Sequence, residues 1–173
     1  EDAFKRLPVH WMWWPAIGAV FVGVGGFLYP RALGVGFDVL GDLVRAPLPL
    51  RELCLIIAVK GAIWCVALGS GTSGGVLAPL LMLGGALGGL AALVLPSFGG
   101  GFWPLIGMGA ILGGTMRSPL TGALFAIEIT QDFRLALPLM VASVAAHGFT
   151  VLVLRRSILT EKIARRGFLV SRQ

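Results

Sequence analysis

The chain has 173 residues, of which 57% are hydrophobic and only 13% are charged, and its formal net charge is +6 at pH 7. Soluble domains rarely combine so many apolar residues with so little charge, so the composition excludes most soluble classes and favours a membrane protein. No nucleic-acid-binding motif accompanies the basic excess. We therefore interpret that excess as a sign of membrane topology, with no nucleic-acid partner.

A long uncharged stretch supports several membrane crossings. From Gly61 to Met116 the sequence contains no Asp, Glu, Lys, Arg or His. As one straight helix this stretch would extend ~84 Å, against a bilayer core of ~30 Å, so it must fold back at least once. A very apolar soluble helical domain is the alternative. We expect a multi-pass integral membrane protein.

The first half of the chain predicts two long helices. One runs over Pro15–Leu28, with a proline in its first turn. Residues 31–49 predict a loop with a short helix near Asp38–Val44. A second long helix follows over Leu50–Leu68, and Lys60 is its only interior charge. The tryptophans before the first helix suit the bilayer interface, where amphipathic rings settle: Trp11, Trp13 and Trp14.

The second half predicts helices separated by glycine and proline. Four are expected: Leu77–Leu95, Trp103–Gly114, Pro119–Thr130 and Leu135–Leu154. Ser118 is the expected N-cap of the third, which is too short to cross a bilayer alone. The segment GGALGG, residues 84–89, spaces glycines four residues apart, so that another helix can approach its backbone closely.

The end of the chain is basic and amphipathic. Six Lys and Arg side chains lie between Arg155 and Arg172, opposed only by Glu161. By the positive-inside rule this end faces the cytoplasm. We therefore divide the chain into a transmembrane part, residues 1–154, and a terminal part, residues 155–173. The terminal part is expected to hold an amphipathic helix from Ser157 to Arg166 and a cytoplasmic exit segment.

The segment GSGTSGGVLAP, residues 69–79, interrupts the most apolar region of the chain. Its glycines permit positive-φ turns that place successive N–H groups on one side. The first turn of the helix that follows leaves its amides without intrahelical acceptors and carries partial positive charge, which suits an anion. The expected backbone donors are Val76 and Leu77, with Gly74 and Gly75 shaping the approach.

Two other interpretations of this segment involve no transported anion. In the first, it is a glycine-rich turn between packed helices whose amides are capped by hydroxyls: Ser70, Thr72 or Ser73. In the second, it is a phosphate loop. The second is weaker, because the Gly-Lys-Ser/Thr ending of a nucleotide loop is absent from the segment.

Four segments together resemble one membrane-protein family. The stretch GSGTSGGVLAPLLMLGGALGG resembles the anion-selectivity segment of the CLC chloride channel and transporter family, and GMGAILGGTMRSPLTGALFAIEIT resembles its later helix-break signature. The stretches FDVLGDL and RRSILTEKIARRG are similar to flanking segments in the same order. The resemblance covers nearly the whole chain from Trp11 onward. It implies an all-α polytopic membrane protein, a broken-helix bundle that forms the second half of the family's inverted-repeat fold.

The resemblance also implies roles for single residues. In the family, two backbone amides at the start of the helix after the motif contact the central chloride, and the matching positions are Val76 and Leu77. Leu77 stands where the family has Phe. Leu159 stands where many members carry a Tyr that contacts the same ion, so Leu159 is a candidate pore-lining residue with an apolar side chain. The family's serine-bearing anion motif and gating glutamate have no match here, which makes an N-terminal half of the same fold an expected partner.

The resemblance further implies a homodimer, each subunit of which holds its own pore. Its interface would involve the two helices after Pro119, which carry several small residues. The candidate interface residues are Leu124, Ile127, Glu128 and Ala136. Glu128 is accordingly assigned to packing or to the interface in preference to proton transfer.

The expected function is transport of chloride, through a channel or a chloride/proton antiporter. The sequence shows no catalytic nucleophile, no pair of residues suited to acid–base catalysis and no metal-ligand spacing. We therefore expect no enzyme and no cofactor. Chloride is the expected transported ligand. Three alternatives remain: a non-conducting structural or assembly fragment, a carrier of another small anion, and a membrane-embedded enzyme. Cys54 and Cys65 lie ~16 Å apart along one expected helix, too far for a disulfide.

Overall fold

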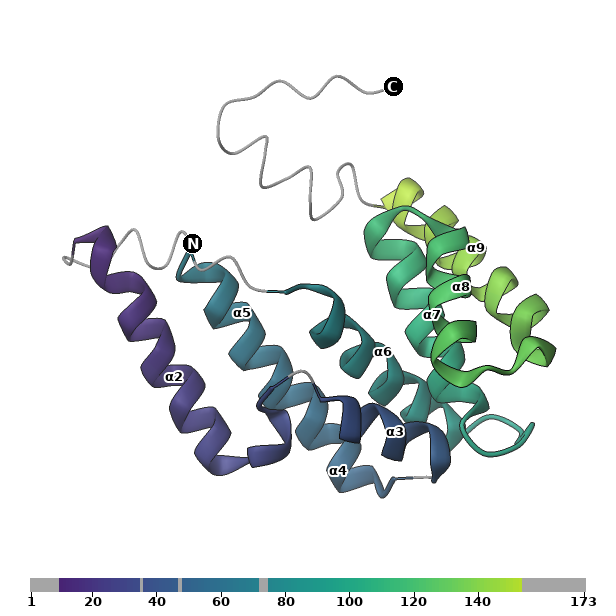
Figure 1. Ribbon diagram of the computed structural model, residues 1–173, viewed down its shortest axis with the longest axis horizontal. Helices are drawn as coiled ribbons and strands as arrows, with labels where there is room; N and C mark the ends of the chain where they lie inside the picture. The colour runs from purple at the N-terminus through teal and green to yellow at the C-terminus, as the bar shows by residue number, and fades with distance from the viewer. Residues whose placement is uncertain (1–9, 35, 47, 72–74, 154–173) are drawn as a thin grey trace.

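The computed structural model describes residues 10–34, 36–46, 48–71 and 75–153. Regular structure within these residues is helical throughout (Figure 1). The α-helices are α2 (Trp14–Leu28), α3 (Phe37–Arg45), α4 (Leu50–Leu55), α5 (Gly61–Gly69), α6 (Leu77–Ala92), α7 (Phe102–Met116), α8 (Pro119–Thr130) and α9 (Ala136–Val153). The short turns are η1 (Trp11–Trp13), η2 (Pro30–Ala32), the π-helical η3 (Ile56–Lys60) and η4 (Phe133–Leu135).

The helices expected from the sequence are present, and their ends differ by at most a few residues. The largest difference lies at the end of α6, which stops at Ala92, before the expected Leu95. There Leu93 and Val94 donate to carbonyls three residues back, so the last turn tightens ahead of Pro96, which cannot continue a helix. The terminal helix expected over Ser157–Arg166, and with it the expected division at residue 154, lies outside the described residues.

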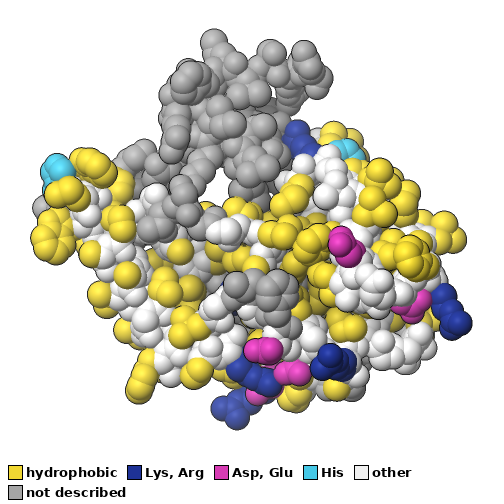
Figure 2. All heavy atoms as spheres, viewed as in Figure 1, with side chains coloured by type: hydrophobic (Ala, Val, Ile, Leu, Met, Phe, Trp, Pro, Cys, Tyr) yellow, Lys and Arg dark blue, Asp and Glu magenta, His cyan; other side chains and the backbone are white. Residues whose placement is uncertain are grey.

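Several helices have the length and apolarity of membrane spans. Three segments could each cross a bilayer: Trp11–Leu28, Leu50–Gly69 and Phe133–Val153. The second is continuous, because η3 joins α4 to α5 without a break. Hydrophobic side chains cover much of the surface, and most of the charged side chains visible in Figure 2 lie toward its edges. The protein is therefore an integral membrane protein with several helices in the bilayer.

The helices form an arc with two packed groups (Figure 1). At one end of the arc α2 packs on α5, and at the other α7, α8 and α9 form a compact bundle. α6 lies between the groups and makes its most extensive contact with α7. Short α3 and α4 lie near the end of α6 that is remote from the glycine motif (Figure 1).

The close approach expected of the GGALGG segment is confirmed, and α7 is the partner. A Cβ built on Gly84 would lie 2.6 Å from the carbonyl oxygen of Gly107, and one built on Gly88 would overlap the carbonyl oxygen of Trp103. The other pair is divided: a Cβ on Gly85 would lie 2.5 Å from Met108 Cε of α7, whereas one on Gly89 would lie 2.8 Å from the Leu53 side chain of α4. Three of the four glycines therefore face α7, and Gly89 faces α4.

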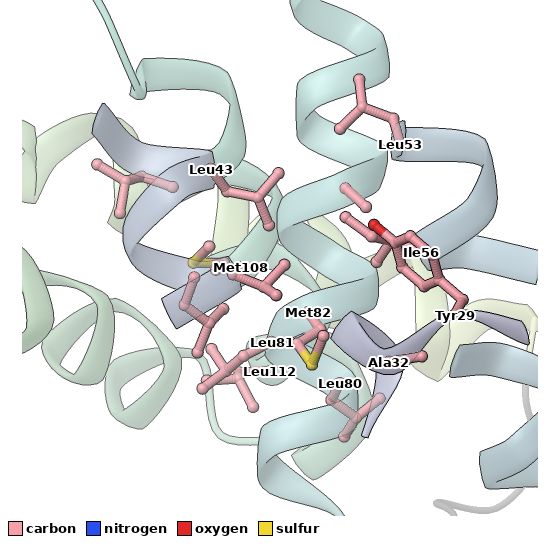
Figure 3. Close-up of a cluster of buried hydrophobic side chains, with 14 residues drawn as sticks. Tyr29, Ala32, Leu43, Leu53, Ile56, Leu80, Leu81, Met82, Met108 and Leu112 are labelled. Carbon is pink, nitrogen blue, oxygen red and sulfur yellow. The ribbon is translucent and has the colours of Figure 1, made fainter. Parts of the chain in front are cut away.

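A buried apolar cluster holds the centre of the arc together (Figure 3). Leu80, Leu81 and Met82 of α6 supply its middle. Met108 and Leu112 reach it from α7. The remaining buried members come from the segment around η2 and from α3, α4, η3, α6 and α7: Tyr29, Ala32, Val39, Leu40, Leu43, Leu53, Ile56, Ala86 and Leu105.

Hydrogen bonds tie α9 to α7. The hydroxyl of Ser143, which is fully buried, donates to the carbonyl of Gly109 at 2.9 Å, and the hydroxyl of Thr150 donates to the carbonyl of Gly114 at 3.0 Å. Such interhelical bonds are a usual means of holding helices together where no hydrophobic driving force acts. They fix the register of α9 against α7.

Candidate functional site

The candidate anion site is the beginning of α6. Val76 is the N-cap residue of this helix and makes no side-chain capping hydrogen bond. In helix geometry the first-turn amides, including that of Leu77, have no intrahelical acceptor and form the positive end of the helix dipole. Pro79 in the same turn has no N–H.

The body of α6 is buried while its beginning is accessible. Most residues from Pro79 to Gly89 are buried, whereas Gly75 is exposed and both Val76 and Leu77 are half-buried. The helix is therefore buried along most of its length, and its N-terminal end, where the helix dipole is positive, lies at a surface of the described chain. An anion at that surface would meet backbone donors, which carry partial positive charge without the full charge of Lys or Arg.

Three of the predicted site residues lie within the described structure. Gly75, Val76 and Leu77 occupy the start of α6, as expected. Gly74 and the pore-lining candidate Leu159 lie outside the described residues. The hydroxyl of Ser70, one of the proposed caps, donates to the carbonyl of Ala67 on its own helix at 2.8 Å.

Lys60 is buried and pairs with backbone carbonyls. Its Nζ atom donates to the carbonyl oxygens of Ala32 and Gly34, both at 2.8 Å, and the residue is only 5% exposed. It closes the π-helical turn η3, and such insertions are frequent near functional sites. Lys60 thus anchors the segment after η2 to the long helix, the structural role expected of a lysine in an apolar span.

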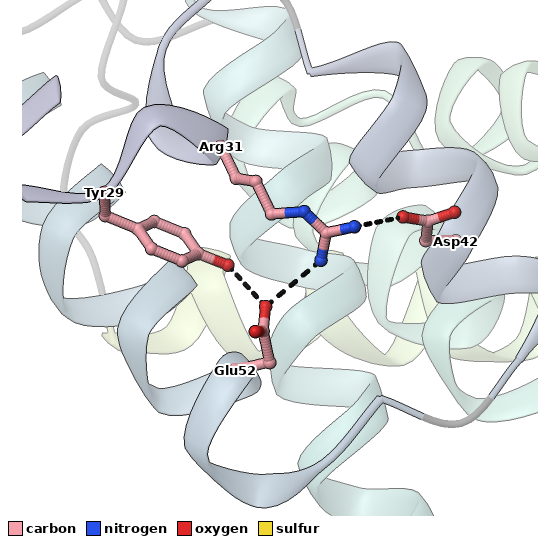
Figure 4. Close-up of polar contacts among 4 residues, drawn as sticks. All are labelled: Tyr29, Arg31, Asp42 and Glu52. Atoms are coloured by element: carbon pink, nitrogen blue, oxygen red, sulfur yellow. Dashed lines mark hydrogen bonds and ion pairs between the residues drawn. The ribbon is translucent and has the colours of Figure 1, made fainter. Parts of the chain in front are cut away.

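A polar cluster lies at the ends of the helices around η2 (Figure 4). The hydroxyl of Tyr29 donates to Glu52 Oε2 at 2.7 Å, and Arg31 bridges Glu52 at 3.1 Å and Asp42 at 2.9 Å. Burial, followed by the hydrogen bond to Glu52, raises the pKa of the Tyr29 phenol. The cluster links η2, α3 and α4, so it braces the end of the fold remote from the glycine motif.

The sequence analysis did not identify this cluster. One signal for it was present, because Tyr29 is the only tyrosine of the chain and stands directly before Pro30 at the end of a helix. Arg31, Asp42 and Glu52 are far apart in sequence, and no local spacing relates them. Only the folding of α3 back toward α4 brings them together.

The four interface candidates occupy different environments. Leu124 is 55% exposed and Glu128 is exposed on α8, and Ala136 at the start of α9 is half-buried. Ile127 points inward and is 6% exposed, in a cluster with Ala123, Ala126 and Leu139. In this chain Leu124 and Glu128 are available for a partner, while Ile127 fills the core between α8 and α9.

The remaining ionisable residues form no recognisable centre. Among the described residues, no group of three His, Cys, Asp or Glu side chains could hold a metal ion. Cys54 and Cys65 are exposed free thiols. Arg117 caps the end of α7 in the left-handed backbone conformation, between α7 and α8.

Comparisons with known proteins agree on one family. A family model described as voltage gated chloride channel matches residues 1–151. The H(+)/Cl(-) exchange transporter ClcA of Klebsiella pneumoniae (strain 342) is 32% identical over 156 residues, which cover 84% of this chain and 33% of the relative. ClcA of Vibrio campbellii is 33% identical over 138 residues, which cover 75% of this chain and 30% of the relative.

A third relative carries a different name. The putative chloride channel protein ClcB-like of Ralstonia nicotianae is 31% identical over 138 residues, which cover 76% of this chain and 32% of the relative. The chain thus spans about a third of the length of the curated relatives that it matches.

Proposed function

The chain belongs to the voltage-gated chloride channel family, and we propose that it forms part of a pathway that moves chloride across a membrane. The proposed site is the start of α6, where the amides of Val76 and Leu77 replace part of the hydration shell of the ion. Gly74 and Gly75 let the ion approach. Leu159 would line the same pathway with an apolar side chain.

The observation that supports this site most directly is the beginning of α6, where the N-cap residue Val76 makes no side-chain capping hydrogen bond. A helix buried along most of its length starts at an accessible surface with no side-chain cap at Val76. Backbone dipoles bind an anion without the full charge of Lys or Arg, so binding is strong enough for entry and weak enough for release. Transport requires that balance.

Two modes of transport are named among the relatives. The two relatives named ClcA are H(+)/Cl(-) exchange transporters, and the third is named a putative chloride channel. We propose either a channel or an exchanger, built from this chain together with an N-terminal half of the same fold. The chemistry is ion coordination, with chloride as the ligand and no enzymatic step.

The assembly we propose is a homodimer in the bilayer with the C-terminus in the cytoplasm. The exposed apolar side chains of α8 and α9, among them Leu120, Leu124 and Leu137, form a surface that a second copy would cover. Glu128 is exposed on the same helix as Leu124. The basic residues after Arg155 give the orientation.

The test removes one backbone donor at the site. Leu77→Pro deletes the N–H at the first helical position, which accepts proline more readily than the helix interior but disfavours the αR conformation of Val76 before it. Leu77→Phe keeps the N–H and changes only the side chain. A hydrogen bond to a charged partner is worth ~1.5–3 kcal/mol, so the proline variant should bind chloride roughly tenfold or more weakly. The phenylalanine variant should stay close to the unsubstituted protein.

The measurement is chloride binding and chloride flux with the protein purified from its native membrane and reconstituted in liposomes. Circular dichroism checks that both variants keep their helices. Equal losses in the two variants would contradict the backbone-donor site. Tight binding without any flux would favour a non-conducting assembly role, and stronger binding of another halide or of nitrate would favour a carrier of a different small anion.

A further inference from the structure

The indole N–H of Trp64 is buried and has no hydrogen-bond acceptor. Its Nε1 atom is one of only two buried side-chain nitrogen or oxygen atoms without a partner among the described residues. An indole N–H can only donate, so no alternative proton position relieves it. Buried donors in native proteins are nearly always satisfied, and an exception calls for a specific cause, such as an ion or a water molecule.

Trp103 shows the ordinary case in the same chain. Its Nε1 atom donates to the carbonyl oxygen of Pro96 at 2.9 Å. The two tryptophans therefore differ in whether their indole N–H has an acceptor among the described residues. A partner from outside the described residues is required for Trp64.

The register of α5 against α6 places Trp64 at about the level of the first turns of α6. A Cβ built on Gly61 would lie 3.9 Å from Leu83 Cδ2, so α5 faces α6 at this level. The two helices run in opposite directions (Figure 1), and counting from this contact brings Trp64 level with Leu80. Leu80 follows Leu77 by three residues, which is about 4.5 Å along the helix axis.

The packing agrees with this register. Trp64, Val76 and Leu77 are all partly buried side chains that pack against the same buried cluster. That cluster includes Leu80, which is 3% exposed. Along the axis of α6, Trp64 is thus level with a residue about one helical turn from the first-turn amides.

We propose that the indole N–H of Trp64 is a further hydrogen-bond donor to the transported anion, next to the amides of Val76 and Leu77. This inference rests on the proposed function and names a side chain that contributes to it. A neutral donor adds a binding position without adding a charge. Conduction favours such weak and multiple sites, because an ion must leave each one again.

The first experiment removes the N–H and keeps an aromatic ring. Trp64→Phe is compared with Trp103→Phe, a matched change at an indole whose acceptor is known. Both are made in the protein purified from its native membrane and reconstituted in liposomes, and chloride binding and flux are measured. We expect chloride affinity to fall about tenfold for Trp64→Phe and to stay unchanged for Trp103→Phe.

The second experiment reports contact between the ion and the ring. In a variant with phenylalanine at the other four tryptophan positions, Trp64 is the single indole fluorophore. Bromide, a heavy-atom quencher, should quench its emission saturably, at the concentrations that saturate bromide binding. Gluconate at equal ionic strength serves as the control and should leave the emission unchanged.

A third variant guards against a simple packing defect. Replacing Trp64 with 3-benzothienylalanine keeps the bicyclic ring nearly isosteric and exchanges the donor N–H for a sulfur atom, which cannot donate. Reduced affinity in this variant supports the proposal, since packing is preserved.

Two results would overturn the inference. One is an unchanged affinity of the Trp64 variants together with a lower unfolding temperature, which would identify a carbonyl of another protein segment as the acceptor. The other is bromide quenching that rises linearly without saturation. Either result, combined with a loss of binding in Leu77→Pro, leaves the proposed function intact, whereas absence of chloride binding in the unsubstituted protein refutes the proposed function itself.

Discussion

Substitution of Gly88 by alanine should separate α6 from α7, the most extensive helix pair among the described residues. A Cβ at this position would overlap the carbonyl oxygen of Trp103 and lie 2.7 Å from its carbonyl carbon and 2.8 Å from Pro104 Cα. All three are backbone atoms, so no side-chain rotation relieves the contact. The matched control is Gly23→Ala, in the apolar helix α2, where a Cβ would meet nothing within 4 Å.

The magnitude follows from the distance that the helices must move. An ordinary contact begins at 3.4 Å, so the Trp103 carbonyl carbon, and α7 with it, must move at least about 0.7 Å away from the new Cβ. A gap of 0.5–1 Å forfeits roughly a quarter to a half of the dispersion energy of the atoms involved. Overpacking of this kind costs about 1–3 kcal/mol. Both alanine variants share the gain in helix propensity, up to about 1 kcal/mol, so their difference isolates the steric cost.

The assay is unfolding in mixed micelles, followed by circular dichroism, for the unsubstituted protein and both variants. Gly88→Ala should be about 1–3 kcal/mol less stable than Gly23→Ala. Equal stabilities would refute the view that the glycines of α6 are there to let α7 approach. A shift of Gly23→Ala in the destabilising direction would show instead that α2 has a partner at that face.

Two further changes test the clusters at the other end of the fold. Lys60→Met leaves the carbonyls of Ala32 and Gly34 without their donor, so it should cost about 1–3 kcal/mol and speed amide hydrogen exchange around Ala32, while Lys60→Arg should do less; unchanged exchange in Lys60→Met would contradict the anchoring role. Tyr29→Phe removes the hydrogen bond to Glu52 and should cost about 0.5–1.5 kcal/mol at neutral pH. The folded-state pKa of Tyr29 is raised above its ordinary value of 10.0, so this stabilisation is complete below pH 10 and is lost as the pH rises through the raised pKa. Unfolding curves of the two proteins should therefore differ at pH 7 and converge at strongly alkaline pH, and a constant difference would contradict the assignment.

The positions of the helices were predictable from the sequence because their causes are local. Apolar runs of limited length mark the helices, and prolines in the first turns of α2, α6, α7 and α8 mark their beginnings. Pro119–Thr130 was predicted to its last residue, with Ser118 at the N-cap position. The cap chemistry differs, however, because the Ser118 hydroxyl bonds the hydroxyl of Thr121 at 2.7 Å and not a backbone amide.

The candidate site was predictable to a similar degree. Glycines followed by an apolar helix start form a local pattern, and both Val76 and Leu77 begin α6 as expected. That these amides bind chloride stays a prediction, as do the dimer and the roles of Gly74 and Leu159.

Partner choice was beyond the reach of the sequence. The spacing in GGALGG indicated that some helix comes close, but the crossing of α6 and α7 decides that Gly84 and Gly88 meet α7 while Gly89 meets Leu53. The charge of Lys60 stood out in the sequence, yet its two carbonyl acceptors lie 28 and 26 residues away. Ile127 is apolar, as residues at an interface often are, and only the packing of α8 on α9 shows that it points inward.

The sequence by itself determined that the chain is a helical membrane protein, where its helices begin and end to within a few residues, and which helix start follows the glycine motif. These properties depend on hydropathy and on backbone preferences that act within one or two turns. The tertiary structure alone decided which buried donors and acceptors are satisfied, and within the described residues it gives the indole N–H of Trp64 no acceptor. The reason is physical: a hydrogen bond across helices depends on their crossing and register, which no segment determines alone.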